Sequence, residues 1–190
     1  MREGKWQQTV GHGLPGKVLG IVGLGRLGVP VAKVGQAFGK KIIAWSPNLT
    51  QERAAEHGAA LASREDPFAK SDFITIHMPL SDRSRGLITA ADLARMKKSA
   101  FLINTSRGPI VDEDALVNAL GAKAIGGVGL DVFDIEPLPT DHPLRSMENT
   151  VLTPHLGYVE VENYEMGFAI NFSPDFDGPF EDGPGILMAP

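Results

Sequence analysis

The chain has 190 residues, of which 43% are hydrophobic and 22% are charged. This is an ordinary globular composition and enough for one domain with a substantial core. The net charge of -5 argues against a nucleic-acid partner, and the absence of cysteine excludes disulfides and thiolate chemistry. No apolar run is long enough to cross a bilayer, and residues 1–8 lack the apolar core of a signal peptide, so we expect a cytoplasmic protein without a membrane partner.

Apolar runs alternate with helix-like stretches, which predicts an α/β fold with a doubly wound parallel sheet. In chain order, strands are expected at 17–22, 42–45, 72–76, 100–103, 125–130 and 150–153. Helices are expected at 26–38, at 51–57 after a Thr50 cap, in a segment that begins at Thr89 and contains Leu93 and Met96, and at 113–120. Asp112 is suited to cap the last helix, and Glu113 and Asp114 favour its amino end.

The first expected strand runs into Gly23-Leu24-Gly25-Arg26-Leu27-Gly28. These glycines follow a strand and open a helix within a strand–helix–strand unit, which is the context of a dinucleotide-binding signature. Gly23 allows a tight turn, Gly25 lets a pyrophosphate approach the backbone, and Gly28 lets the helix pack closely on the sheet. The free N–H groups at the start of the helix favour a bound phosphate. We therefore predict a Rossmann-like dinucleotide-binding domain.

Ser46 follows the second expected strand, where NAD-specific proteins normally carry an acidic residue for the ribose hydroxyls. A serine neither makes that charged hydrogen bond nor repels a 2′-phosphate. Asn48, Thr50 and Arg53 lie just beyond and could contact such a phosphate, although Arg53 could equally be a solvated helix residue. NAD and NADP both stay open as the cofactor.

Charged residues lie where the later strands end: Arg107, Asp131 and His155, with Glu136 shortly after Asp131. Carboxyl ends of parallel strands share one edge of the sheet, where open α/β sheets bind ligands. A carboxylate beside a histidine orients the ring and favours its protonated form, so the pair can deliver a proton to a carbonyl oxygen. Arg107 could bind a substrate carboxylate through two hydrogen bonds, or could be a structural arginine that packs a loop.

The histidines show no metal-ligand spacing, so no metal is expected. His77 ends a strand, where a lone histidine is more often structural than catalytic. Met78 and Pro79 are expected to border the adenine or ribose side of the cofactor. No role is predicted for His12, His57 or His142.

Five ordered motifs between about Gly16 and Tyr164 resemble the D-isomer-specific 2-hydroxyacid dehydrogenases, and specifically their nucleotide-binding domain. They are the glycine pattern, His77-Met78-Pro79-Leu80 with 81–86, the block 104–116, Gly129-Leu130-Asp131-Val132-Phe133 with Glu136-Pro137, and Thr153-Pro154-His155-Leu156-Gly157. The resemblance implies that Arg107, Glu136 and His155 are the catalytic set. It also implies an NAD(P)-dependent oxidoreductase that interconverts a 2-oxo acid, such as glyoxylate or hydroxypyruvate, and a D-2-hydroxy acid.

The resemblance further implies how the cofactor is held. Arg26 and Leu27 would meet the pyrophosphate through their backbones, Thr105 and Ser106 would line the nicotinamide side, and Asp131 would face the carboxamide. The full expected cofactor-binding set is Gly23, Gly25, Arg26, Leu27, Gly28, Ser46, Met78, Pro79, Thr105, Ser106, Asp131, His155 and Gly157. Because the family commonly dimerises through this domain, a homodimer is expected.

The chain departs from the family in its domain organisation. We expect a connecting segment at 1–16, the dinucleotide-binding domain at 17–168, and an acidic, Pro/Gly-rich tail at 169–190. The family's substrate-facing domain would then be largely absent, as in a truncated gene product or a trimmed chain. Without that domain, which forms one side of the substrate cleft in the family, the substrate is held loosely and water is not excluded. We therefore expect dinucleotide binding with slow turnover or none.

There are three alternatives to a 2-hydroxyacid dehydrogenase. Formate dehydrogenase, a relative in the same superfamily, is disfavoured because it pairs its histidine with glutamine, whereas this chain has Glu136. Some family members are dinucleotide-sensing corepressors that keep the same site, so the motifs do not separate them from enzymes. The third alternative is a dinucleotide-binding remnant without catalysis.

Overall fold

The structure is a computed structural model that describes residues 4, 6, 11 and 13–161. Much of the expected connecting segment at 1–16 and the whole expected tail at 169–190 lie outside the described residues. The chain divides into two compact units, Met1–His155 and Leu156–Pro190, and the fold below is that of the first unit. Within the described residues, no helix combines the length and apolar character needed to span a membrane.

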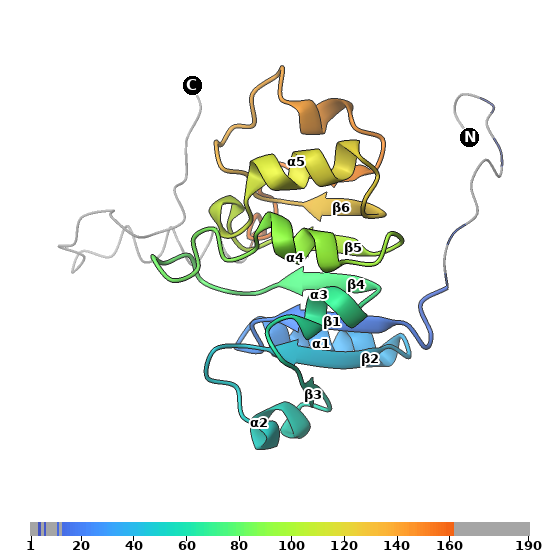
Figure 1. The fold of residues 1–190 in the computed structure, drawn as a ribbon, viewed down its shortest axis with the longest axis vertical. Coiled ribbons are helices and arrows are strands. Elements are labelled where there is room, and N and C mark those ends of the chain that lie inside the picture. Colours follow the sequence, from blue (N-terminus) through green and yellow to red (C-terminus); the bar gives the residue numbers. More distant parts are fainter. Residues whose placement is uncertain (1–3, 5, 7–10, 12, 162–190) are drawn as a thin grey trace. The chain divides into compact units, whose positions relative to one another are not determined.

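A single parallel sheet organises the first unit. Its strands are β1 (Val18–Val22), β2 (Lys41–Trp45), β3 (Ala60–Leu61), β4 (Phe73–Ile76), β5 (Phe101–Asn104), β6 (Gly127–Leu130) and β7 (Thr150–Leu152). Their order in the sheet is β3-β2-β1-β4-β5-β6-β7, so the chain crosses the sheet between β3 and β4 (Figure 1). This order confirms the doubly wound, Rossmann-like fold. The sequence did not predict β3, because two exposed residues are too short for an apolar pattern.

Helices cover the sheet on two faces. They are α1 (Gly28–Ala37), α2 (Gln51–Glu56), α3 (Asp66–Lys70), α4 (Ala90–Arg95) and α5 (Glu113–Gly121), with two 3₁₀ turns, η1 (Gly108–Ile110) and η2 (Pro143–Ser146). Ala32 of α1 and Ala54 of α2 pack with Leu19 and Ile21 of β1 on one face. Helices α3, α4 and α5 cover the other face (Figure 1). The core there includes Phe68 of α3, Leu93 of α4 and Leu116 and Leu120 of α5.

Side-chain caps fix where the helices begin. Thr50 accepts the N–H of Arg53 at 3.3 Å, and Asp112 accepts the N–H of Ala115 at 2.9 Å, which confirms both predicted caps. Met96 was expected inside a helix, but α4 ends at Arg95 and Met96 follows it in an extended conformation. Met96 is still buried in the core. Its apolar side chain therefore indicated a buried position correctly, but it did not indicate that the helix extends to this residue.

The strand register lines up the carboxyl ends of the strands. Neighbouring strands pair their last residues in one continuous row, Trp45, Val22, Ile76, Asn104, Leu130 and Leu152. The chain therefore leaves six neighbouring strands at the same level. Every segment that continues from this row starts at one edge of the sheet, which is where the predicted site residues are found.

Candidate active site

The residues that follow the row are Ser46, Gly23, His77, Thr105, Asp131 and Thr153. Backbone hydrogen bonds hold several of them in line: Gly23 donates to Trp45 at 2.8 Å, His77 to Val22 at 2.8 Å, and Asp131 to Asn104 at 3.0 Å. The predicted glycine loop and the predicted catalytic residues up to His155 thus lie along one edge of the sheet. The sequence prediction that strand ends gather these residues is confirmed.

The three glycines of the loop differ in what surrounds them. Gly23 has φ +104°, and a Cβ added there would lie 2.4 Å from the carbonyl oxygen of His77. A Cβ on Gly28 would lie 2.1 Å from the carbonyl oxygen of Gly23. A Cβ on Gly25 would meet no protein atom within 4 Å. The protein itself therefore excludes side chains at Gly23 and Gly28, whereas the space beside Gly25 is open.

The loop continues into the exposed amino end of α1. Arg26 is exposed, Leu27 is 64% exposed, and no side chain caps the first turn of the helix. Ser46 contributes from the neighbouring strand, because its Oγ accepts the N–H of Leu24 at 2.9 Å. The hydroxyl that stands in place of the expected acid thus supports the glycine loop, which the sequence did not predict.

Met78 and Pro79 lie next to the glycine loop. Met78 is half-buried, and its Cγ would be 3.2 Å from a Cβ on Gly23, whereas Pro79 is exposed. Ser84 fixes this segment: its Oγ donates to the carbonyl of Pro79 at 2.7 Å and accepts the N–H of Ser81 at 2.8 Å. Sequence reasoning missed Ser84 because a serine in a polar loop resembles any surface residue until its burial is known.

The segment that presents Arg107 is built around a buried amide. Asn104 is 1% exposed; its Nδ2 donates to the carbonyl of Arg107 at 2.9 Å and its Oδ1 accepts the N–H of Ser106 at 3.0 Å. Ser106 ties this turn to β4 by donating its hydroxyl proton to the carbonyl of Ile76 at 2.7 Å. Thr105 and Arg107 are exposed, and Arg107 Nη1 donates to the carbonyl of Ser106 at 2.6 Å. A fixed backbone thus carries an exposed guanidinium.

The structure brings Glu136 and His155 into direct contact. Glu136 Oε2 lies 2.7 Å from His155 Nδ1, and Glu136 Oε1 accepts the N–H of Phe133 at 2.9 Å. His155 adopts φ +53°, in the left-handed region. Asp131 is 4% exposed and accepts a hydrogen bond from the hydroxyl of Thr153. The backbone N–H of Phe133 therefore orients the carboxylate of Glu136, and this carboxylate in turn orients the ring of His155.

Two groups near this edge have displaced pKa values. Burial lowers the pKa of His77, so its ring is neutral near pH 7, and Nε2 lies 2.9 Å from the hydroxyl of Thr75. This agrees with the structural role expected for His77. Burial raises the pKa of Asp134, and the nearby carboxylate of Glu113 raises it further, whereas Arg85 opposes both effects.

One predicted cofactor-binding residue is not placed relative to this arrangement. Gly157 belongs to the unit Leu156–Pro190, so its position beside the loop stays a prediction. For metals, the described part of the chain contains no group of three or more His, Cys, Asp or Glu residues that could hold an ion.

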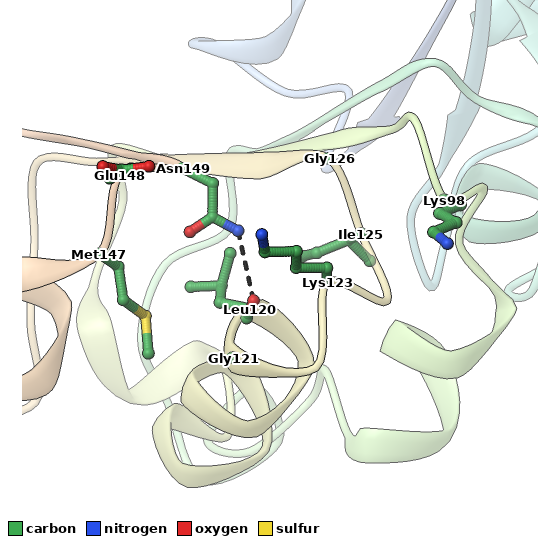
Figure 2. Close-up of a pocket in the computed structure, with 9 residues that line it drawn as sticks. All are labelled: Lys98, Leu120, Gly121, Lys123, Ile125, Gly126, Met147, Glu148 and Asn149. Atoms are coloured by element: carbon green, nitrogen blue, oxygen red, sulfur yellow. Dashed lines mark hydrogen bonds between the residues drawn. The ribbon is translucent and has the colours of Figure 1, made fainter.

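A pocket of about 550 Å³ lies away from the predicted site. Figure 2 shows its lining: Lys98, Leu120, Gly121, Lys123, Ile125, Gly126, Met147, Glu148 and Asn149. Gly126 and Asn149 directly precede β6 and β7, so this pocket is at the amino ends of the strands, and Asn149 Nδ2 donates to the carbonyl of Leu120 at 3.3 Å. Lys123 follows the last turn of α5 by two residues, where a helix carboxyl end normally attracts a basic side chain. None of the predicted site residues lines it.

Comparison with known proteins identifies the family. Residues 1–157 match the family described as D-isomer specific 2-hydroxyacid dehydrogenase, NAD binding domain, and the chain belongs to this family. It is 43% identical over 173 residues to a D-3-phosphoglycerate dehydrogenase of Synechocystis sp., a match that covers 90% of this chain and 31% of the relative. It is 49% identical over 146 residues to a glyoxylate reductase of Aeropyrum pernix, covering 77% of this chain and 44% of the relative.

A solved structure agrees with this assignment. The crystal structure of a phosphoglycerate oxidoreductase from Vibrio cholerae O395 matches with a TM-score of 0.83 and 38% identity, covering 88% of this chain and 55% of that chain. The chain thus spans between about a third and a half of the length of these relatives. The family resemblance inferred from the five motifs is confirmed.

Proposed function

We propose that this chain supplies the dinucleotide-binding and acid–base part of an NAD(P)-dependent oxidoreductase that interconverts a 2-oxo acid and a D-2-hydroxy acid. The observation that carries the proposal is the hydrogen-bonded pair of Glu136 and His155 on the sheet edge that also holds Arg107 and the glycine loop. Glyoxylate and hydroxypyruvate are the substrates we would test first, since one of the similar relatives is a glyoxylate reductase.

The glycine loop fits a dinucleotide. The open space beside Gly25 lets a pyrophosphate approach the backbone, and the uncapped amino end of α1 offers N–H groups to its charge. Ser46, Met78 and Thr105 are proposed to line the ribose, adenine and nicotinamide sides respectively. When bound, the dinucleotide supplies or accepts the hydride.

The polar residues of the later strands are proposed to handle the substrate. Arg107 binds its carboxylate and polarises the adjacent carbonyl, because a planar guanidinium can donate two parallel hydrogen bonds. Glu136 holds Nδ1 of His155, which fixes the ring, and Nε2 then delivers the proton to the carbonyl oxygen during reduction. Asp131, held by Thr153, is proposed to face the nicotinamide carboxamide.

Fluorescence titration with NADH and NADPH, followed by NADH oxidation with glyoxylate or hydroxypyruvate, tests the proposal. We expect saturable binding of at least one dinucleotide. In Arg107→Ala we expect binding to stay intact and turnover to fall by about 100-fold, because the substrate loses its charged anchor. Arg95→Ala is the matched control, since Arg95 is also exposed and also folds back onto a backbone carbonyl, that of Ala91, at 2.8 Å.

Each outcome has a distinct meaning. Failure to bind either dinucleotide would reject the proposal as a whole. Binding without any 2-oxo acid reduction would restrict the chain to the binding function. Equal turnover in the Arg107→Ala variant and the unmodified chain would reject the role of Arg107 alone.

The family membership also supports a homodimer in the cytoplasm as our proposal for assembly and location. Sedimentation velocity over a range of chain concentrations tests the first part. A single species at the mass of one chain at every concentration would reject the dimer.

A further inference from the structure

A second carboxylate–histidine pair lies beside the proposed catalytic pair. Glu113, the first residue of α5, has Oε1 3.1 Å from Nε2 of His142. Its other oxygen, Oε2, accepts the N–H of Asp134 at 3.3 Å. The side chains of Glu113 and His142 are only 22% and 18% exposed. Neither residue has a role in the function proposed above.

The hydrogen bonds of His142 fix its tautomer. Nδ1 accepts the N–H of Leu144 at 3.3 Å and thereby caps η2. A ring nitrogen that accepts a hydrogen bond carries no proton, so the proton is on Nε2 and is donated to Glu113. Glu113 therefore uses one oxygen for His142 and the other for the backbone of Asp134.

The peptide bond between Phe133 and Asp134 connects this pair to the catalytic carboxylate. Its N–H donates to Glu113, and one residue earlier the N–H of Phe133 donates to Glu136 Oε1. The opposite contact comes from Gly108, next to Arg107. A Cβ on Gly108 would lie 2.1 Å from the carbonyl carbon of Phe133 and 2.5 Å from the nitrogen of Asp134. The peptide is thus held between the Arg107 turn and Glu113.

We propose that Glu113 and His142 form a clamp that positions Glu136 for its contact with His155, an inference that rests on the catalytic role proposed for that pair. The clamp fixes the peptide that precedes Asp134. The Phe133 N–H that Glu136 accepts lies in the next peptide, on the other side of the Phe133 Cα, so fixing one peptide restricts the orientation of the other. A carboxylate held by the backbone keeps one orientation, and outer contacts of this kind commonly control how well a histidine is aligned. Both residues are positioning residues, because neither touches the reacting atoms.

Two variants separate the clamp from its surroundings. Glu113→Gln keeps the size of the side chain but offers one acceptor oxygen for two donors. His142→Asn keeps an oxygen that can cap η2 by accepting the N–H of Leu144, but it is too short to reach Glu113. Asp114→Asn is the matched control, since Asp114 is exposed and loses the same charge from the same first turn of α5.

The readouts are the amide hydrogen exchange of Phe133 and the NMR resonance of the His155 ring N–H that faces Glu136, both recorded on the full chain. In Glu113→Gln and His142→Asn we expect Phe133 exchange to rise roughly tenfold and the ring resonance to broaden, as for the loss of one charge-assisted hydrogen bond. NADH binding should be unchanged, whereas kcat should fall without a change in the KM for NADH. The double variant should be no worse than the more affected single variant, because the two residues form one unit.

Unchanged Phe133 exchange and an unchanged His155 resonance in both variants would overturn the clamp. The same changes in Asp114→Asn would assign the effect to the charge of the helix end instead. Additive effects in the double variant would show that the two residues act separately. Because the NMR readouts need neither cofactor nor substrate, a chain that bound no dinucleotide would reject the proposed function but would still test the clamp.

Discussion

The two halves of the functional edge are built by opposite means. After β1, the glycine loop requires positions without side chains, since a methyl group on Gly28 would lie 2.1 Å from a backbone oxygen. After β5 and β6, the loops depend on polar atoms that are present, such as the amide of Asn104 and the carboxylate of Glu136. The first half tolerates no added volume at Gly23 or Gly28, whereas the alignment of the second half depends on its hydrogen bonds.

This difference predicts which substitutions reduce the stability of the fold and which change the orientation of the site residues. A close approach of backbone to backbone cannot relax without moving α1 away from β1, so errors there cost folding energy. A loop held by side-chain hydrogen bonds can lose one of them and keep its path, so errors there misalign the site first. Substitutions in the two halves should therefore be distinguishable by whether stability or alignment changes.

The largest effect is expected from added volume at Gly28. Gly28→Ala should lower the free energy of unfolding by about 3 kcal/mol or prevent folding, because the carbonyl of Gly23 cannot move aside. Gly25→Ala is the matched variant, since its added Cβ meets no protein atom within 4 Å. We expect it to keep its stability and lose dinucleotide binding. Urea unfolding and NADH titration measure the two quantities.

If Gly25→Ala bound NADH as well as the unmodified chain, the pyrophosphate would not pass over Gly25. If Gly28→Ala were as stable as the unmodified chain, the first half would not be limited by close packing, and the contrast between the halves would be wrong.

A smaller loss of stability, of about 2 kcal/mol, is expected from Asn104→Ala. The substitution leaves the N–H of Ser106 and the carbonyl of Arg107 without the buried amide that satisfies them. Any turnover should fall more than stability suggests, because the backbone of Arg107 is no longer fixed, while NADH affinity changes little. Asn118→Ala, an exposed substitution on α5, is the control. Equal effects on NADH affinity and turnover would contradict an orienting role.

The sequence predicted the parts of the molecule whose signals are local. The apolar runs and the glycine pattern predicted β1, α1 and β2 to within two residues. The structure also places Glu136 and His155 in contact, whereas the catalytic roles of Arg107, Glu136 and His155 stay predictions. The parallel, doubly wound character of the sheet followed from the alternation of strands and helices, because parallel strands need crossover helices, whereas the strand order is seen only in the structure.

What the sequence missed depends on distant partners or on very short elements. α3 has five residues with a proline at its start, and this leaves no periodicity to detect. His142 is 29 residues from Glu113, and Ser46 is 22 residues from Leu24, so no spacing links either pair. The positioning contacts of the site appear only when the fold brings these residues together.

An ion pair between the segment that precedes α3 and the helix α4 has a defined pH dependence. Asp92 of α4 is 1% exposed and accepts hydrogen bonds from Arg64 Nη1 at 2.7 Å, Arg64 Nη2 at 3.0 Å and the N–H of Thr89 at 3.0 Å. Burial alone would raise the pKa of Asp92, but the hydrogen bonds from Arg64 and Thr89 outweigh it and hold the pKa below its ordinary value. The carboxylate is therefore stabilising only while it is ionised.

The sign of the pH effect follows from this lowered pKa. The stabilisation by Asp92 should be complete above about pH 4, the ordinary value in an unfolded chain, and should be lost as the pH falls through the lower value of the folded state. Asp92→Asn should cost about 1.5 kcal/mol at pH 7 and less at pH 3. Urea unfolding at pH 7, 5, 4 and 3 tests this, with Asp66→Asn, a partly exposed i,i+4 partner of Lys70, as the control. An equal cost at pH 7 and pH 3 would exclude the ionised carboxylate as the source.

The smallest effect on stability, and the clearest on selectivity, is expected at Ser46. Ser46→Asp keeps an acceptor for the N–H of Leu24, so stability should change by less than about 1 kcal/mol. The new carboxylate can accept from ribose hydroxyls and repels a 2′-phosphate, so the ratio of NADH to NADPH affinity should rise roughly tenfold. Ser46→Ala, which removes the acceptor without adding charge, should weaken both dinucleotides equally. If Ser46→Asp also weakened both equally, Ser46 would support the glycine loop without facing the ribose, and the first half would act on the cofactor through its backbone alone.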